Sequence, residues 1–219
     1  MNKKIFTGLL LVVLTASYAQ AQFHVGMRLG FNASSMYGDY VPIFWDDAKV
    51  EARAGFQGGI VGELELGRHF AIQPGILYAQ QGYTTVAKNG DMVREADYLL
   101  NYLQVPLNLL AKMPIGRSGN IFFQVGPYVG YALSGKLKLE AREDGTVVDS
   151  QEGTVHFKGH DGDTMERLDY GVGFGLGFQA RGIQFDIEYR LGLQSLSNTP
   201  GIDMKNNGLA IKLSYFIGK

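Results

Sequence analysis

Charged side chains avoid one face of every segment of this sequence that can form a β-strand. In Phe23–Asn32 the odd positions are all apolar, whereas His24, Arg28 and Asn32 lie among the even ones. This period of two is the side-chain period of a strand, because successive side chains point to opposite faces of a sheet. Seven further segments repeat the pattern, which is typical of strands that face lipid on one side and a polar or glycine-rich interior on the other.

The eight segments define the expected fold. They are residues 23–33, 55–66, 69–82, 98–112, 120–133, 168–180, 183–193 and 207–217. The connections between them alternate between long and short, as outer loops and periplasmic turns do in outer-membrane barrels, and an even strand number brings both termini to the periplasm. The sequence therefore predicts an all-β protein, an eight-stranded antiparallel up-and-down transmembrane β-barrel in the outer membrane of a Gram-negative cell.

The first residues predict the route to that membrane. Two lysines, Lys3 and Lys4, precede an apolar run from Ile5 to Leu14, and the small-residue site Ala19-Gln20-Ala21 follows. This order predicts a secretory signal peptide over residues 1–21, and the run is shorter than the roughly 20 residues of a membrane-spanning helix. We expect residues 22–219 to form one outer-membrane β-barrel domain. Since the chain has no cysteine and a formal net charge of −1, disulfides, thiolate metal sites and nucleic-acid binding are not expected.

The longest connection, residues 134–167, has a pattern of its own. Charged residues alternate with leucine and alanine from Lys136 to Arg142, and the turn signal Asp144-Gly145 follows. This predicts a hairpin that projects above the membrane. Its return limb is expected at Thr146–Val148 or at Thr154–Phe157.

Several stretches resemble the PorT-like family of Bacteroidota outer-membrane β-barrels. They are Phe70–Gly82, Tyr102–Lys112, Val125–Gly130, Leu168–Gly177 and Glu188–Leu196. The resemblance implies the barrel fold and an outer-membrane location, and it supplies no catalytic residue. The family takes its name from a member linked to type IX protein secretion. The loops, where an individual function would lie, are outside the resemblance.

Nine charged residues are expected to point into the barrel: Arg28, Glu63, Glu65, Lys112, Asp169, Asp186, Glu188, Arg190 and Lys212. An eight-stranded barrel is just wide enough for its own side chains. The favoured interpretation is therefore a salt-bridged plug that fixes the barrel shape. The alternative is a gated or very narrow polar pore, which many small inward residues would allow.

Three further patterns could indicate a phosphate-binding loop, a metal site or a catalytic triad. Gly171–Gly177 is interpreted as a strand with a glycine inner face, because its spacing is two and it lacks the helix start of a phosphate-binding loop. A solvated turn is expected at His156, His160, Asp161 and Asp163, although these residue types can bind zinc or calcium. The serines Ser134, Ser195 and Ser197 show no triad pattern with that segment. We therefore expect no enzyme, no catalytic residue, no cofactor and no metal.

The first loop offers a possible contact surface at Tyr37, Tyr40, Phe44 and Trp45, since exposed aromatic clusters often mark binding sites. The alternative is that these residues fold down onto the barrel rim. Expected partners are outer-membrane lipid, the outer-membrane assembly machinery through Tyr215 and Phe216, and envelope or secretion proteins through the loops. The sequence thus favours a non-enzymatic structural or accessory envelope component, with a narrow-solute channel second and a barrel enzyme third.

Overall fold

Every regular element of the described chain is a β-strand. The computed structural model describes residues 23–38, 48–116, 118–157, 165–197 and 201–218. The strands are β1 (Phe23–Tyr37), β2 (Lys49–Glu65), β3 (Phe70–Asn89), β4 (Met92–Ile115), β5 (Gly119–Glu143), β6 (Thr146–Thr154), β7 (Leu168–Ala180), β8 (Ile183–Gly192) and β9 (Lys205–Phe216). Among these residues no helix is long and apolar enough to cross a membrane. The predicted signal peptide lies outside the described residues.

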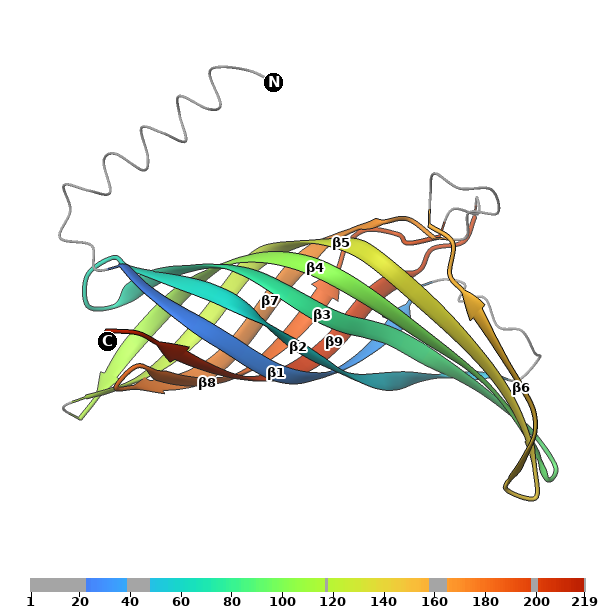
Figure 1. Cartoon of the computed structure of the whole chain (residues 1–219). Helices are drawn as coiled ribbons and strands as arrows, with labels where there is room; N and C mark the ends of the chain where they lie inside the picture. Colours follow the sequence, from blue (N-terminus) through green and yellow to red (C-terminus); the bar gives the residue numbers. More distant parts are fainter. Residues whose placement is uncertain (1–22, 39–47, 117, 158–164, 198–200, 219) are drawn as a thin grey trace, which may run out of the picture.

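The strands form one antiparallel sheet that closes on itself (Figure 1). Its order is β4-β3-β2-β1-β9-β8-β7-β5-β6, and a further pairing of β4 with β5 completes the circuit. Apart from β6, each strand in the circuit runs up or down beside its sequence neighbour, and β1 pairs with β9. The prediction of an all-β, antiparallel, up-and-down arrangement is confirmed. Nine strands are present where eight were expected, and the additional strand, β6, pairs only with β5 among the described strands.

The period-two pattern of the sequence becomes an exposed apolar outer face and a buried inner face. On β1, Phe31 is 78% exposed, whereas its neighbour Asn32 is 5% exposed. The same division holds on β9, where Leu213 is exposed and Lys212 is buried. Large apolar side chains on the outside and charged ones on the inside reverse the usual arrangement of a water-soluble protein.

The connection between the third and fourth predicted strands is more ordered than the sequence suggested. Residues 83–97, expected as a loop, continue β3 and β4 up to a tight turn at Gly90-Asp91. The strands were predicted from their apolar outer stripe, and that stripe stops where charges begin. Backbone pairing does not stop there, because the cross-strand hydrogen bonds of a hairpin need no lipid on either face.

The hairpin predicted at Asp144-Gly145 is present. Both turn residues have positive φ, 49° and 77°, as a two-residue turn that matches strand twist requires. The return limb is β6, which includes the first predicted option, Thr146–Val148. Of the second option, Thr154–Phe157, only Thr154 lies in β6, and Val155 and Phe157 enter a buried apolar cluster.

The outer parts of β2 to β6 form a sheet that we call the arm: residues 49–53, 83–89, 92–99, 135–143 and 146–154. In Figure 1 the arm extends from the end of the closed sheet that is opposite the C-terminus. β2 to β5 each run as a single strand from the closed sheet into the arm. Within the arm, Arg53 Nε donates to Asp97 Oδ1 at 2.8 Å, and the rings of Tyr83 and Tyr98 stack at 4.5 Å. The arm is therefore a continuation of the wall and not a separate unit.

Candidate functional site

The interior of the closed sheet holds all nine charged residues predicted to point inward. Alternation along each strand places them there, so that Asp186, Glu188 and Arg190 follow one another at every second position of β8. Eight of the nine are buried, and Glu65 is partly exposed at the end of β2. The structure thus brings together four cations and five carboxylates from six strands: Arg28, Lys112, Arg190 and Lys212 with Glu63, Glu65, Asp169, Asp186 and Glu188.

One group of charges is centred on Glu63, near the end of the sheet that carries the C-terminus. Lys112 Nζ lies 2.6 Å from Glu63 Oε1 and 3.5 Å from Glu65 Oε1. The second oxygen of Glu63 accepts from Gln73 Nε2 at 2.6 Å and from Gln179 Nε2 at 3.0 Å. Both carboxylate oxygens of this fully buried residue are therefore used, which offsets much of the cost of removing the charge from water.

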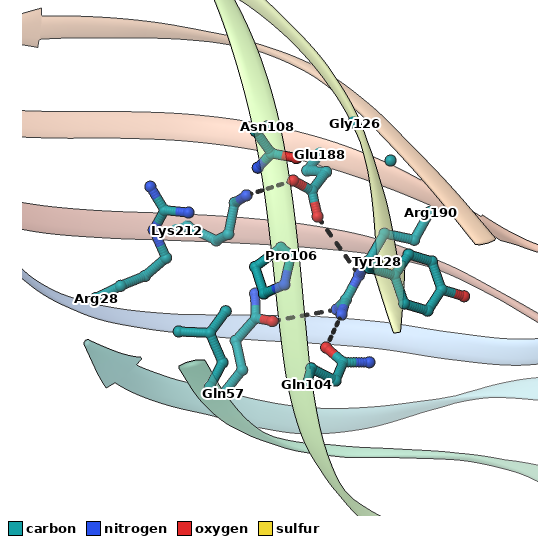
Figure 2. Close-up of a pocket in the computed structure, with 12 residues that line it drawn as sticks. Arg28, Gln57, Gln104, Pro106, Asn108, Gly126, Tyr128, Glu188, Arg190 and Lys212 are labelled. Carbon is teal, nitrogen blue, oxygen red and sulfur yellow. Dashed lines mark hydrogen bonds and ion pairs between the residues drawn. The ribbon is translucent and has the colours of Figure 1, made fainter. Parts of the chain in front are cut away.

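A second group is centred on Lys212 (Figure 2). Its Nζ lies 2.8 Å from Asp186 Oδ2 and 2.6 Å from Glu188 Oε2. Glu188 also faces Arg190 Nε at 3.5 Å, and the Arg190 guanidinium donates to Gln104 and to Gln57, the latter at 3.2 Å. The chain of contacts crosses the interior from β8 and β9 to β4 and β2, so opposite walls are linked through side chains.

Two predicted members stand apart from these ion pairs. Arg28 donates from Nε to Ser214 Oγ at 2.7 Å and from its Nη2 to Gln73 Oε1 at 2.9 Å. Asp169 Oδ2 accepts from Asn206 Nδ2 at 2.9 Å and from the Tyr128 hydroxyl at 3.4 Å. No carboxylate lies within ion-pair distance of Arg28, and no cation within that distance of Asp169, among the described residues.

Buried glutamines, which were not among the predicted site residues, join the groups. Gln73 contacts Arg28, Glu63 and Gln184, while Gln124 donates at 3.0 Å to both Asp186 and Glu188. Uncharged amides suit this place because each both donates and accepts. The signal was available, since glutamine recurs at inward positions of the strands: Gln57, Gln73, Gln81, Gln104, Gln124, Gln179 and Gln184.

Little space remains between these side chains. The cavity shown in Figure 2 has a volume of about 10 Å³ and lies beside Arg28, Gln104 and Lys212. A second one, beside Ser34, Gln81 and Asn206, has the same volume. About that much space holds a single water molecule. Around these two cavities the interior is thus filled by polar side chains.

Glycine on β7 makes room for this core. A Cβ on Gly177 would lie 2.3 Å from the ring of Phe122, and one on Gly173 would lie 3.2 Å from the Glu188 carboxyl carbon. Gly171–Gly177 lies within the strand β7, so the strand interpretation of this run is confirmed.

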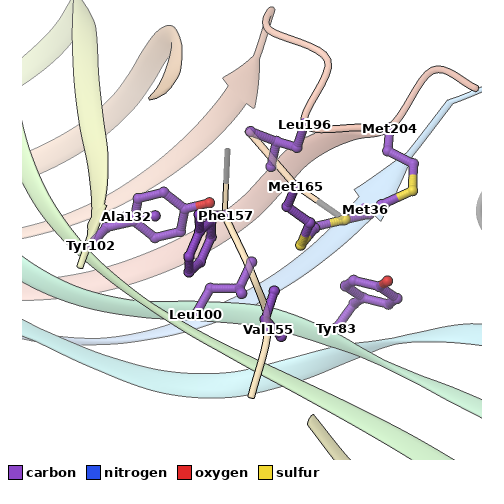
Figure 3. Close-up of a cluster of buried hydrophobic side chains, with 10 residues drawn as sticks. All are labelled: Met36, Tyr83, Leu100, Tyr102, Ala132, Val155, Phe157, Met165, Leu196 and Met204. Carbon is purple, nitrogen blue, oxygen red and sulfur yellow. The ribbon is translucent and has the colours of Figure 1, made fainter. Parts of the chain in front are cut away.

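A buried apolar cluster, which we call the mouth cluster, lies at the arm end of the interior (Figure 3). Strands contribute Met36, Tyr83, Leu100, Tyr102 and Ala132, and the connections contribute Val155, Phe157, Met165, Leu196 and Met204. Every member is buried to 94% or more. The polar core is therefore capped by side chains that exclude water.

Backbone contacts hold the connecting segments in the mouth. Val155 N donates to Gly135 O at 3.1 Å, and Leu196 N donates to Met204 O at 2.7 Å. Met165 forms bridges with both Phe157 and Ser197. The Arg167 guanidinium carbon lies 5.4 Å from the centre of the Phe157 ring and 5.9 Å from that of Tyr131, a cation–π arrangement.

The outer face of the arm carries an ion-paired row. Glu140 contacts Lys138 Nζ at 2.5 Å and Arg142 Nη2 at 2.7 Å. Hydrogen bonds from Lys138 and then from Arg142 lower the pKa of Glu140. On the opposite face of the arm, burial raises the pKa of Tyr83.

The structure gives no support to the chemical alternatives in the segments that it describes. Ser134 Oγ accepts from Asn101 at 2.9 Å, and Ser195 Oγ accepts from Met204 N at 3.2 Å, so both serines serve local structure. Among the described residues no group of three or more histidine, aspartate or glutamate side chains could hold a metal ion. His160, Asp161 and Asp163 lie outside the described residues.

Only one residue of the predicted first-loop surface is described. The Tyr37 hydroxyl donates to Gly192 O at 2.7 Å, which ties the end of β1 to the end of β8. This contact fits the rim interpretation for Tyr37. Tyr40, Phe44 and Trp45 lie outside the described residues, so a loop surface there stays a prediction.

Comparison with known proteins gives a family match and several similar structures. The sequence profile of the family described as outer membrane protein beta-barrel domain matches residues 18–198. A structure of Ail, the attachment invasion locus protein of Yersinia pestis, in complex with the heparin analogue sucrose octasulfate is 14% identical, with a TM-score of 0.39 over 90% of this chain and 99% of that one. Neisserial surface protein A (NspA) is 12% identical, with a TM-score of 0.45 over 89% and 97% of the two chains.

The outer membrane protein OprG of Pseudomonas aeruginosa is 12% identical, with a TM-score of 0.44 over 91% of this chain and 98% of that one. No curated protein matches the chain. Because these identities and TM-scores are low, nothing of the roles of Ail, NspA or OprG is carried over.

Proposed function

This chain belongs to the outer membrane protein beta-barrel domain family, and from that premise we propose that it is a non-enzymatic, closed barrel that anchors the arm at the cell surface. Eight strands, β1–β5 and β7–β9, form the membrane wall, and β6 belongs to the arm alone. In this proposal the barrel is a rigid membrane anchor, and the arm is the part that contacts other molecules.

The filled interior is the observation that carries this proposal. The ion pairs of Lys112 and Lys212 link the strands, and the cavity beside Lys212 has a volume of about 10 Å³. A hydrated ion or small solute needs a continuous path, and the mouth cluster lies across the outer end of any such path. The proposal therefore favours the salt-bridged plug over the narrow pore.

The proposed orientation has both termini in the periplasm and the arm outside the cell. The start of β1 and the end of β9 pair, Gly26 with Phe216, so both lie at one end of the barrel. Connections of two to four residues lie at that end, between β2 and β3, between β4 and β5, and between β7 and β8, and the arm lies at the other. Short periplasmic turns and longer outer loops are the rule for such barrels.

An accessory role in the envelope is the biological part of the proposal. Partners would include outer-membrane lipid along the apolar outer face, the outer-membrane assembly machinery during insertion, and envelope or secretion proteins through the arm and loops. The PorT-like resemblance motivates protein secretion as the first process to test.

Conductance measurements test the closed barrel. Purified protein, refolded and inserted into planar bilayers, is expected to stay silent across voltage and salt concentration. A variant that lacks the mouth cluster through Phe157→Ser and Leu196→Ser serves as a comparison. Stepwise currents from the unmodified protein would favour the narrow-solute channel instead.

The accessory role is tested in cells. The gene is deleted, and secreted, periplasmic and envelope proteins are compared with the wild type by quantitative proteomics. Periplasmic accumulation of secreted cargo is expected if the barrel serves secretion. An unchanged secretome would remove that link and leave a surface role for the arm.

A further inference from the structure

Strand β6 is an open edge of the sheet. It pairs with β5 from Lys136↔Thr154 to Glu143↔Thr146, and no other described strand pairs with its second side. All nine of its residues are exposed. At roughly 3.3 Å per residue, the edge is about 30 Å long.

The usual protection of an edge strand is weak here. Natural edges are shortened or carry lysine, proline or inward charges, which discourage another strand from pairing. β6 is nine residues long and contains neither proline nor lysine. Its one irregularity is the register shift at Val148, between the pairs Arg142↔Val147 and Ala141↔Asp149, and residues 149–154 pair without interruption.

Two apolar side chains on β6 are exposed above the membrane wall. Val147 is 47% and Val148 is 55% exposed. The arm places them beyond the apolar outer face of the barrel, so lipid does not cover them. An added strand would cover them and would at the same time satisfy the open backbone groups.

The negative charge of β6 determines which kind of partner strand can pair with its open edge. It carries Asp149 and Glu152 and no cation. The two carboxylates are three positions apart and so lie on opposite faces of the sheet. Lys138, which stands opposite Glu152, is already bonded to Glu140 at 2.5 Å. A second copy of β6 would bring two more carboxylates to the edge, whereas lysine or arginine on a neighbouring strand would pair with those present.

We propose that the β6 edge is a docking site for an extended, basic segment of another protein, which adds to the arm as a further strand. This inference rests on the proposed function, because the arm must lie at the cell surface for the edge to be available. Backbone pairing provides the affinity, and the two carboxylates select basic partners.

A synthetic peptide tests the proposal. The probe has nine residues, with two lysines three positions apart among valine and threonine, and a fluorophore at one end. It is titrated into the full-length protein, refolded in lipid nanodiscs. A control peptide of the same sequence carries N-methyl groups on alternate amides, which keep the side chains and charges but remove strand pairing.

The probe is expected to bind, and to slow hydrogen exchange across residues 146–154, whereas the N-methylated peptide does neither. The Asp149→Lys, Glu152→Lys variant is expected to bind the probe roughly tenfold more weakly. The matched control, Asp91→Lys in the neighbouring exposed turn, is expected to bind as the wild type does.

Three results would overturn the proposal: equal binding of both peptides, unchanged binding after the charge reversal, or self-association of the protein through β6 in sedimentation experiments. Circular dichroism of each variant checks that the barrel has folded. None of these results would contradict the proposed function, because a barrel that conducts no ions and exposes the arm is consistent with each of them.

Discussion

Loss of the Lys212 ammonium tests whether the interior is a filled, ion-paired core. Lys212→Met keeps the length and apolar stem of the side chain but removes the charge that lies 2.8 Å from Asp186 and 2.6 Å from Glu188. Both carboxylates are buried. After the substitution they remain in the interior with fewer compensating partners.

The structure sets the size of the expected effect. Breaking a buried ion pair by removing one partner costs about 3–5 kcal/mol. Glu188 retains Arg190 at 3.5 Å, and Asp186 retains Gln184 and Gln124 at 3.1 Å and 3.0 Å. We therefore expect the lower end of that range, about 3 kcal/mol of unfolding free energy.

A second variant separates lost charge balance from lost packing. In Lys212→Met, Asp186→Asn one cation and one carboxylate are removed together, and Glu188 still faces Arg190. We expect this variant to recover most of the loss, to within about 1 kcal/mol of the wild type, because no buried carboxylate is left without a cation nearby.

The assay is reversible urea unfolding of protein refolded in phospholipid vesicles, followed by far-ultraviolet circular dichroism. Lys136→Met in the arm, where the side chain is exposed, is the matched control and should leave the midpoint unchanged. If Lys212→Met destabilises by less than about 1 kcal/mol, the value of an exposed pair, water must reach the carboxylates. The argument for a filled core would then be wrong.

Three further results are expected. First, the pKa of Glu140 is lowered in the folded protein, so its bonds to Lys138 and Arg142 stabilise the arm at pH values above the ordinary glutamate pKa of 4.5. This stabilisation is lost as the pH falls through the lower pKa of the folded state. The protection of β5 and β6 amides from hydrogen exchange, expressed relative to the intrinsic exchange rate at each pH, should therefore fall in acid for the wild type, and Glu140→Gln should abolish this dependence; the same acid response in the variant would contradict it. Second, Phe157→Ala removes a buried ring, at a local cost of about 3–5 kcal/mol, so limited proteolysis should cut the connection after β6 while the dichroism of the barrel persists; resistance equal to the wild type would show that the ring does not hold the mouth cluster together. Third, Gly177→Ala places a Cβ 2.3 Å from the Phe122 ring and 2.6 Å from Phe185 O, so refolding yield should fall sharply, whereas Gly153→Ala, with nothing within 4 Å, should refold normally; similar yields would refute the steric role.

The wall of the barrel was predictable because lipid imposes a strict rule. A charge on the outer face of a barrel costs about 2–4 kcal/mol at mid-membrane, so the apolar stripe of a strand such as β7 marks its extent closely: residues 168–180 were predicted and Leu168–Ala180 is observed. The inward positions of Lys212 and Asp186 followed from the same alternation.

The arm and the mouth cluster were less predictable, for physical reasons. Above the membrane wall the rule no longer applies, and the strand from Met92 to Tyr98 has charges on its outer face, as any soluble strand may. The mouth cluster combines Met36 and Met204 with residues from the long third connection. Such contacts depend on how loops fold back over the barrel, and alternation along a strand contains no information about that.

The pairing of β1 with β9 also decides how this protein is made. Twelve registered pairs join the first strand of the barrel to the last one, so these contacts span almost the whole described chain and have the largest loop-closure cost in the sheet. Until β9 pairs with them, β1 and β8 are both open edges. The apolar outer face beside them is then exposed to water, which is unfavourable in free energy. A chain that lacks its last strand therefore carries two edges that another chain can pair with, which makes the incomplete sheet prone to aggregation.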